Sequence, residues 1–326
     1  MLILKKNPER DFVLLNLSDP QLSDGEWAEE HPNHKIFDET VKTLVARVKP
    51  DLITVSGDIA WAGNNVSYRR FAEYLDAFGI PWAPVWGNHD NQGGEAMVDA
   101  VADEYLSHPL CMYEKGDPKL GNGNYIIGIE EEGKLVSAVF MLDSHDRMPY
   151  TTPLGQETLV WAKLIPEQLI WYREQVKELE KQGCRDSVII MHIPNYGYRD
   201  AFAAALKPGV DPKSVKPEDS TGSAYWNEGY TDSFGVAYEG ICSYEADDGV
   251  MDVVTALGST KHIIAGHDHV NNTVITYRGV KLIYSLKCGA GCYWNPILNG
   301  GTVLSFGHDG AYDVRHEFVD VSALLG

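Results

Sequence analysis

Five short apolar runs each end at a polar residue that can bind a metal ion, and this recurrence strongly constrains the fold. The runs are FVLLNLS, LITVSG, PWAPVWG, SVIIM and HIIAG, and they lead to Asp19, Asp58, Asn88, His192 and His267. A short apolar run bounded by turn residues predicts a buried strand. In open α/β sheets the carboxyl ends of the strands lie along one edge, where ligands bind. We therefore expect the five side chains to meet at one edge of a sheet.

Helical patterns separate the first three of these runs. Residues 38–50 place apolar side chains on one face, with Asp38 as a candidate cap and Pro50 as a stop. A second helix is predicted from its cap at Ser67 to Gly79, and a third over residues 94–106. Alternating strands and helices predict parallel strands that are joined by right-handed crossovers.

The rest of the chain predicts a second sheet and an insertion. Residues 124–144 form a predicted hairpin, residues 166–183 a helix, and residues 261–319 a set of hairpins with Arg-Gly and Asp-Gly turns. Residues 195–245 have no clear period, and so long an unpatterned stretch in a compact domain is often functional. We predict one α/β domain over residues 1–326, with two mixed sheets packed face to face, helices outside and a substrate-side insertion at 195–245.

Composition argues against several classes of partner and against secretion or membrane insertion. Against 27 Lys and Arg residues stand 47 Asp and Glu, a net charge of −20. This balance argues against binding to a nucleic-acid duplex or to an anionic membrane, since both need basic side chains. The first residues show no secretory signal pattern, and no apolar stretch is long enough to span a membrane. Five scattered cysteines predict a reducing cytoplasm, and we expect Cys288 and Cys292 to be small buried residues.

The residues at the strand ends have the chemistry of a transition-metal site. Oxygen donors and imidazoles occur together, which favours Mn, Fe, Zn, Ni or Co over Ca or Mg. Two such ions about 3.5 to 4 Å apart can activate a hydroxide and hold a phosphoryl group from both sides. Glycines precede Asp58, Asn88 and His267, and we expect them where the backbone approaches the site closely.

The ordered motifs resemble those of one known superfamily. They are Asp19-Pro20-Gln21, Gly57-Asp58, Gly87-Asn88-His89-Asp90, His192 and Gly266-His267-Asp268-His269. The set resembles the calcineurin-like metallophosphoesterases, whose pattern is D-x-H, GD, GNH with an acidic residue, a lone H and GHxH. The resemblance spans residues 13–270 and implies a four-layer fold, in which two mixed sheets form a sandwich that is flanked by helices.

The resemblance also implies a role for each matching position. Asp19 and His269 would hold the first metal, Asn88, His192 and His267 the second, and Asp58 would bridge both. His89 would face the substrate and protonate the leaving oxygen, and Asp90 would orient His89. The implied reaction is hydrolysis of phosphate mono- or diesters by attack of a bridging metal-bound hydroxide. The alternative is a catalytically weak or inactive metal-binding regulatory module of the same fold.

Two positions depart from family patterns. Gln21 stands where histidine is usual, so the first metal would be bound through the Gln21 oxygen, be bound with a water in that place, or be lost. Since amide oxygen is a harder donor than imidazole, the glutamine favours Mn or Fe over Zn. Trp61 stands where purple acid phosphatases carry a ligating tyrosine, which argues against a purple ferric enzyme. The chain resembles a D-x-Q variant near that branch.

Substrate contacts are the hardest part to predict. The substrate would be a small-molecule or protein phosphoester. Arg147 is a candidate for binding a phosphate oxygen or for a surface ion pair, and Asn195 and Tyr196 for the wall of the cleft or a structural turn. The aromatic residues of the insertion either stack on a substrate or anchor the loop to the core: Tyr225, Trp226, Tyr230 and Tyr238. Six further histidines are predicted to be structural or on the surface, with one of the first two at the rim of the site: His31, His34, His108, His262, His308 and His316.

Overall fold

Two mixed β-sheets dominate the computed structural model, which describes residues 1–307 and 310–325. The five-stranded sheet has the order β14 (Tyr312–Phe318), β13 (Gly300–Phe306), β2 (Phe12–Leu17), β3 (Leu52–Ser56) and β4 (Trp82–Val85). The seven-stranded sheet has the order β1 (Leu2–Lys5), β5 (Tyr125–Glu131), β6 (Lys134–Met141), β9 (Ser187–Ile190), β10 (Thr260–Ala265), β12 (Val280–Tyr284) and β11 (Val274–Tyr277). Strands β2, β3 and β4 are parallel to one another, as are β6, β9, β10 and β12.

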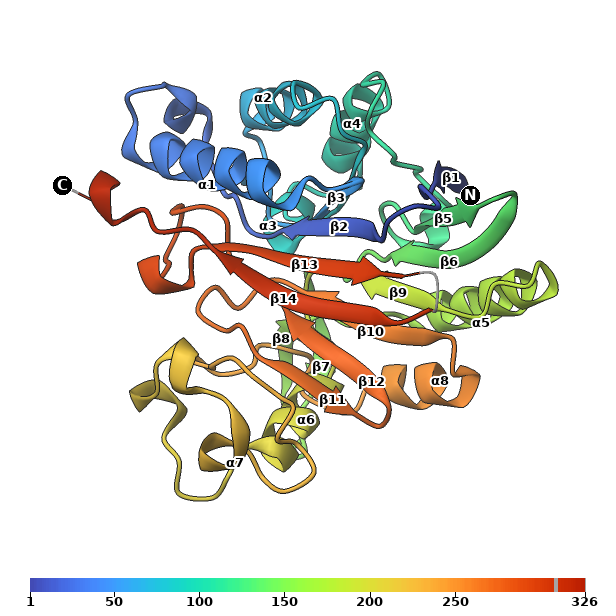
Figure 1. The fold of residues 1–326 in the computed structure, drawn as a ribbon, viewed down its shortest axis with the longest axis vertical. Helices are drawn as coiled ribbons and strands as arrows, with labels where there is room; N and C mark the ends of the chain where they lie inside the picture. The colour runs from blue at the N-terminus through green and yellow to red at the C-terminus, as the bar shows by residue number, and fades with distance from the viewer. Residues whose placement is uncertain (308–309, 326) are drawn as a thin grey trace.

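Helices cover the outer face of each sheet (Figure 1). Over the five-stranded sheet lie α1 (Pro32–Val48), α2 (Asn65–Asp76) and α4 (Glu95–Tyr105), and over the other lie α5 (Pro166–Lys181), α6 (Gly197–Ala205) and α8 (Val250–Leu257). Shorter helical turns complete the chain: α3 (Asn88–Asn91), α7 (Gly222–Tyr225), η1 (Asp24–Trp27), η2 (Pro118–Leu120), η3 (Pro212–Ser214), η4 (Pro217–Asp219), η5 (Pro296–Leu298) and η6 (Ser322–Leu324).

Alternation along the strands shows how the layers are held together. In β6, Val139 and Met141 point into the core shared with the five-stranded sheet, whereas Ala138 and Phe140 pack against α5. Successive side chains of a strand face opposite sides of the sheet, so each strand of this sheet contributes to two apolar layers. The predicted sandwich of two mixed sheets with helices outside is confirmed.

Several element boundaries differ from the sequence prediction. Helix α1 begins at Pro32, and its cap is the His31 side chain, which accepts a hydrogen bond from the Asn33 amide; Asp38 lies inside the helix. Ser67 lies inside α2, where its hydroxyl donates a hydrogen bond to the Leu22 carbonyl. Serine and aspartate are good caps, but here both side chains make tertiary contacts instead, Asp38 with the Tyr74 hydroxyl and Ser67 with the Leu22 carbonyl.

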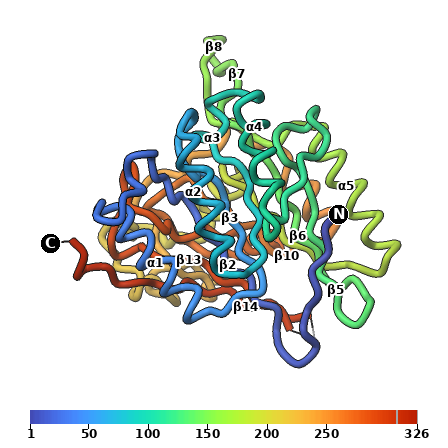
Figure 2. Tube along the Cα trace, turned by 90° about the horizontal axis from the view of Figure 1, so that it is seen from above, coloured from blue at the N-terminus to red at the C-terminus, as the bar shows by residue number. Residues whose placement is uncertain are grey.

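The hairpin of β7 (Arg147–Thr151) and β8 (Glu157–Trp161) has no counterpart in the sequence prediction. It projects beyond the rest of the chain (Figure 2) and pairs with neither large sheet. None of its side chains is buried, and Leu154 in the turn and Leu159 in β8 are exposed. Without a buried face the strands carry only a short and weak apolar alternation, which is the signal that sequence patterns detect.

The unpatterned stretch 195–245 is anchored by its aromatic residues. Tyr225 and Trp226 are 2% and 1% exposed and belong to the core beneath the seven-stranded sheet. The Tyr238 hydroxyl donates a hydrogen bond to the Val215 carbonyl within the same stretch. Of the two roles considered for these rings, the structure supports the anchor.

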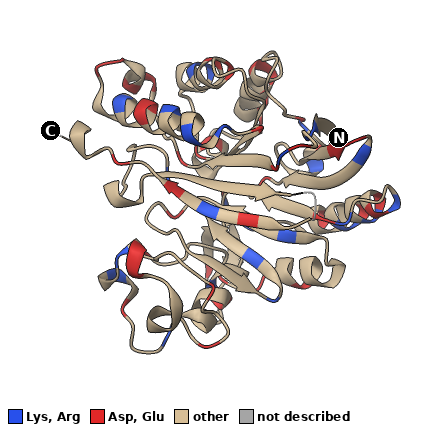
Figure 3. Cartoon of the chain, viewed as in Figure 1, with Lys and Arg blue, Asp and Glu red and all other residues tan. Residues whose placement is uncertain are grey.

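Three remaining features concern the surface and the cysteines. Acidic and basic residues are interspersed along α1, α5 and β14 (Figure 3), whereas the charged residues of α4 are all acidic. None of the helices in the described residues has the length and apolarity that a membrane crossing requires. Cys288 is buried as expected, but Cys292 is exposed, which corrects that prediction. His308 and the first residue of the predicted Asp309–Gly310 turn lie outside the described residues.

Candidate metal centre

The predicted site lies where the strand ends of the two sheets meet, rather than along the edge of a single sheet. Nδ1 of His192, which follows β9, lies 2.7 Å from the Ser56 carbonyl oxygen at the end of β3. The His267 amide, after β10, donates to Oδ2 of Asp19 across the same junction. These bonds join the seven-stranded sheet to the five-stranded sheet, because β2 and β3 belong to the latter.

Glycines allow this close approach, as the sequence predicted. A Cβ atom on Gly57 would overlap the Gly87 backbone and the His192 ring, and one on Gly266 would overlap the Ser18 hydroxyl. A residue with a side chain at these places would separate the two sheets. The motifs SGD, WGN and AGH therefore carry glycine for a steric reason.

The backbone that carries the metal-ligand candidates adopts an uncommon conformation. Asp19, Gln21, Asp58 and His267 have φ values of 52°, 44°, 50° and 77°. Positive φ is uncommon for residues other than glycine and is concentrated at functional sites. Amide hydrogen bonds from Asp19 to Gly57 and from Gln21 to Asp58 hold the two loops together in this conformation.

One group of side chains converges on Nε2 of His192. This atom lies 3.0 Å from Oδ1 of Asn88, 3.4 Å from Oδ2 of Asp58 and 3.3 Å from Nδ1 of His267. Because Nδ1 of His192 faces the Ser56 carbonyl oxygen and donates to it, Nε2 of the neutral ring is an acceptor, so a proton or a metal ion on Nε2 suits its contacts with Asn88 and Asp58. When no metal is bound, a proton on His192 takes this place. Burial alone would lower the pKa of the ring, but the nearby Asp58 carboxylate outweighs burial and raises this pKa to about 9. Burial and the neighbouring His192 lower the pKa of His267 to about 3, which keeps that ring neutral.

The spacing of these atoms fits a metal coordination shell. Ligands on bonds of about 2.1 Å lie roughly 3.0 Å apart in an octahedral shell and roughly 3.4 Å apart in a tetrahedral one. The distances from His192 Nε2 fall in this range, at 3.0, 3.3 and 3.4 Å. His192 also directs its Nδ1 to a backbone carbonyl, the outer contact that metal-bound histidines make.

A second group of ligand candidates adjoins the first through Asp58. Asp19, Asp58 and His269 bring ligand atoms within 4.8 Å of one another, and all three residues are buried. Nε2 of His269 lies 3.3 Å from Oδ1 of Asp19, and its Nδ1 lies 2.8 Å from the Tyr293 carbonyl. Burial opposes ionisation of Asp19, but His269, His192 and Lys287 outweigh it and hold its pKa below the ordinary value. This carboxylate is therefore ionised and able to bind a cation.

Gln21 lies beside this second group, but its oxygen is bound to a residue that the sequence did not single out. Nζ of Lys287 donates to Oε1 of Gln21 over 2.7 Å and to the Asp19 carbonyl over 2.8 Å. Nε2 of Gln21 donates to Oδ2 of Asp58 over 3.1 Å. The only signal in the sequence is a lysine among small and apolar residues in YSLKCGAGC, since lysines are seldom buried without a partner.

His89 lies at the mouth of the centre, where the sequence placed the catalytic group. Its Nε2 is 4.0 Å from Oδ2 of Asp58, its Nδ1 is 3.1 Å from Oε1 of Gln92, and its side chain is 27% exposed. The Trp61 ring packs beside it at 6.0 Å between centroids. His89 is thus close enough to face a substrate that is bound at the centre.

Asp90 makes different contacts from the predicted one with His89. Its carboxylate accepts hydrogen bonds from the amides of Gly87, Ile59 and Ala60 and from the Tyr68 hydroxyl. These bonds fasten the SGD loop to the GNHD turn, while His89 turns to Gln92. Burial, with the charge of Asp58, raises the pKa of Asp90 to about 7. The contacts assign Asp90 to positioning two ligand loops.

The candidate substrate residues lie in two different surroundings. The Arg147 guanidinium stacks on Trp161 at 4.0 Å, and Trp161 lies 4.4 Å from the His267 ring, so Arg147 is at the rim. Asn195 is 2% exposed; its Oδ1 accepts from the Gly197 amide, and its Nδ2 is among the buried atoms that lack a partner. Tyr196 precedes α6, and its amide donates to Asp248. Asn195 and Tyr196 thus form the turn into α6.

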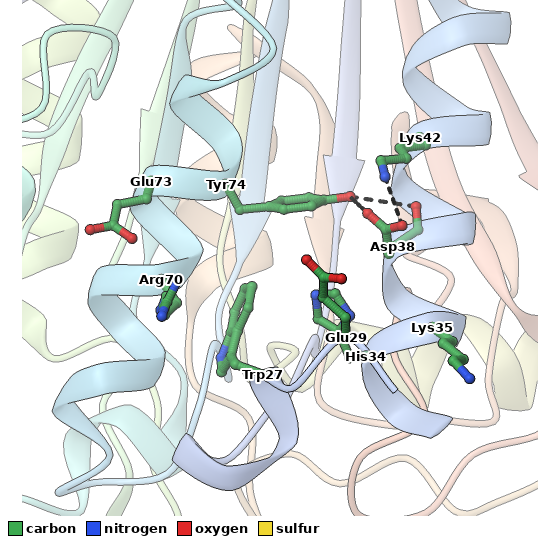
Figure 4. Close-up of a pocket in the computed structure, with 9 residues that line it drawn as sticks. All are labelled: Trp27, Glu29, His34, Lys35, Asp38, Lys42, Arg70, Glu73 and Tyr74. Atoms are coloured by element: carbon green, nitrogen blue, oxygen red, sulfur yellow. Dashed lines mark hydrogen bonds and ion pairs between the residues drawn. The ribbon is translucent and has the colours of Figure 1, made fainter. Parts of the chain in front are cut away.

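A separate pocket of about 610 Å³ opens between α1 and α2 (Figure 4). His34 lines this pocket, and His31 caps α1, so neither contributes a ligand to the centre. Asp38 in the pocket is bound by Lys42 at 2.8 Å and by the Tyr74 hydroxyl at 3.0 Å. The Asp38 carboxylate at the centre of this pocket is therefore already bound by two neighbouring side chains.

Comparison with known proteins agrees with this arrangement. The family described as calcineurin-like phosphoesterase matches residues 12–271. A probable inactive purple acid phosphatase 28 of Arabidopsis thaliana is 25% identical over 282 residues, which cover 78% of this chain and 62% of that protein. The phosphatase DCR2 of Saccharomyces cerevisiae is 28% identical over 162 residues, which cover 44% of this chain and 28% of that one. The chain thus spans less than two thirds of either relative.

A solved structure shows the same fold. A dimetal phosphatase from Danio rerio superposes with a TM-score of 0.57 at 16% identity, over 95% of this chain and 97% of that one. At this identity the likeness concerns the fold.

Proposed function

The chain belongs to the calcineurin-like phosphoesterase family, and on this premise we propose that it is a dinuclear metal-dependent phosphohydrolase that cleaves phosphate mono- or diesters. One observation carries the proposal. Acceptor atoms of Asp58, Asn88 and His267 surround Nε2 of His192 at metal-shell distances, with His89 exposed at the mouth.

The residues present suit two transition-metal ions, with Mn or Fe ahead of Zn, Ni or Co. Asn88, His192 and His267 would hold one ion, Asp19 and His269 the other, and Asp58 would contact both. When bound, such ions activate water at neutral pH and neutralise the charge of a phosphoryl group. The mixture of oxygen and imidazole donors is the one that these metals favour.

The chain's own residues then position the substrate and move a proton. His89 can donate a proton to the leaving oxygen, since its side chain is partly exposed and its Nε2 lies 4.0 Å from Oδ2 of Asp58. Asp90 keeps the loops of Asp58 and Asn88 in register through the Gly87 and Ile59 amides. Arg147 at the rim supplies a positive charge for a phosphate oxygen.

Metal analysis combined with a turnover assay tests this function. We expect about two metal equivalents and Mn²⁺-stimulated hydrolysis of p-nitrophenyl phosphate, bis-p-nitrophenyl phosphate or both. His89→Ala should abolish most turnover at unchanged metal content, whereas His34→Ala, in the pocket between α1 and α2, should retain it. A fully loaded protein that hydrolyses no tested ester would overturn the proposal.

A second candidate is a catalytically weak or inactive metal-binding regulatory module. Two observations favour it: the Gln21 oxygen is bound to Lys287, and three Arabidopsis relatives carry the name probable inactive purple acid phosphatase. Full metal binding without hydrolysis in the same assay would select this candidate.

The proposed substrate is a small-molecule or protein phosphoester, and neither a nucleic-acid duplex nor a membrane is a proposed partner, given the net charge of −20. The five free cysteines support a reducing compartment, and the proposed location is the cytoplasm.

A further inference from the structure

Lys287 is built into the floor of the metal centre. It is 3% exposed, and its ammonium group contacts Oε1 of Gln21 and the carbonyl of Asp19. The Cys288 amide bonds to the Ser18 carbonyl, which seats this segment directly on the SDPQ loop. A lysine buried this deeply requires specific partners.

Two glycines make that seat possible. A Cβ atom on Gly289 would overlap the Pro20 carbonyl, and one on Gly291 would overlap the Gln21 carbonyl. The motif KCGAGC therefore brings its lysine beneath the ligand loop by backbone contact. This also gives a steric reason for the glycines between the two cysteines.

The orientation of the Gln21 amide is set by the chemistry of its two partners. Lys287 has only donors, so it must face the oxygen, and the Asp58 carboxylate has only acceptors, so it must face the nitrogen. A reversed amide would place donor against donor and acceptor against acceptor. The oxygen that could bind a metal is thus held by Lys287.

We propose that Lys287 keeps Gln21 out of the metal coordination and makes the position of Asp19 and His269 the weaker and more exchangeable of the two. This position keeps three protein ligands, whereas the position around His192 has four. The ammonium group of Lys287 also lies beside this position, and its charge opposes binding of a cation there. The inference rests on the proposed dinuclear function and specifies how its two positions differ.

Mn²⁺ binding to the metal-free full chain tests the proposal by isothermal titration calorimetry. The wild type should bind in two steps of different affinity. Lys287→Met should tighten the weaker step at least tenfold and leave the tighter step within threefold. Lys261→Met, which removes an exposed lysine that is paired with Asp186, is the matched control and should change neither step. A weaker step that is unchanged or loosened by Lys287→Met would overturn the proposal.

A second variant covers the case in which Lys287→Met does not fold. Gln21→Met keeps the side-chain length and removes the oxygen. If Gln21 is not a ligand, the weaker step should change less than threefold; a tenfold loosening would show that the oxygen binds the metal and would overturn the proposal.

The Mn²⁺ electron paramagnetic resonance spectrum gives a readout that a purely structural role would not move. In a Mn²⁺ titration, the signal of coupled pairs should appear at a free Mn²⁺ concentration at least tenfold lower in Lys287→Met than in the wild type. Coupled pairs that appear at the same free Mn²⁺ concentration in both proteins would count against the proposal. Because binding is measured without substrate, failure of the proposed function appears as absent hydrolysis, and failure of this inference appears as unchanged binding constants.

Discussion

Nε2 of His192 lies 3.0 Å from Oδ1 of Asn88. The amide oxygen is a hydrogen-bond acceptor, and without a proton on Nε2 the imidazole nitrogen is an acceptor too, so the two atoms would repel each other. The two residues come from different sheets and lie 104 positions apart in the chain. A cation between them resolves this contact, and the first prediction concerns its removal.

Stripping metal should lower the melting temperature, and adding Mn²⁺ should restore it. A ligand that binds only the folded state at 100 times its Kd stabilises that state by about 2.7 kcal/mol. Asn88→Ala should lose most of this metal-dependent gain in a calorimetric melt. Asn33→Ala, on α1 away from the centre, should keep it. Equal gains in the two variants would contradict the assigned ligand.

His89→Ala should lower kcat by about 10²- to 10⁴-fold, as expected for loss of a general acid. The loss should be larger for an alkyl phosphate than for a nitrophenyl phosphate, because the alkoxide leaving group needs the proton more. Parallel kinetic series on both esters would measure it. Equal losses would indicate that His89 only binds the substrate.

Tyr68→Phe should destabilise the fold by about 1 to 3 kcal/mol, because it removes a buried hydrogen bond of 2.8 Å to the Asp90 carboxylate. Tyr74→Phe removes a hydroxyl that bonds Asp38 in the pocket between α1 and α2, and is the matched control with a smaller expected loss. Urea unfolding curves compare the two. A similar free energy for both variants would argue against a central role for the Asp90 contacts.

Acid should destabilise the protein in part through His262. This ring is 5% exposed and packs at 4.7 Å from Tyr312, and burial, reinforced by Lys281 and Lys261, lowers its pKa to about 3. As the pH falls below about 6.5, His262 binds a proton in the unfolded chain but stays neutral in the folded chain. The free energy of unfolding therefore falls until the pH nears the pKa of folded His262.

His262→Phe removes this dependence. Relative to the wild type, the variant should gain about 2 to 3 kcal/mol between pH 7 and pH 4.5, from 1.36 kcal/mol per pH unit. Urea unfolding at the two pH values measures the difference. Parallel pH profiles of the two proteins would show that His262 does not titrate in this way.

The tightening of the weaker metal position that Gln21→His produces should be larger in the Lys287→Met background than in the wild type, since the ammonium group remains beside the new imidazole in the single variant. A double-mutant cycle of Mn²⁺ binding constants measures the coupling. Strict additivity would mean that Lys287 and position 21 act independently.

Much of this site could be predicted from short patterns, and the exceptions share a physical cause. Asp19, Asp58, Asn88, His192 and His267 stand out because each follows a buried strand. Lys287 follows the end of β12, and its apolar neighbours in the sequence mark it as a buried lysine but do not reveal its partners, since Gln21 and Asp19 are more than 260 residues away. The contacts of Asp90 with Tyr68 and the Ile59 amide were missed for the same reason.

By itself, the sequence determined most strands and helices and the identity of the ligand candidates, because periodicity and turn glycines are local properties. Only the tertiary structure decided that the ligands meet between two sheets, since that depends on how the sandwich stacks. It also decided the surroundings of Gln21. Its amide can offer either an oxygen or a nitrogen to the centre, and the choice is made by Lys287 on one side and Asp58 on the other.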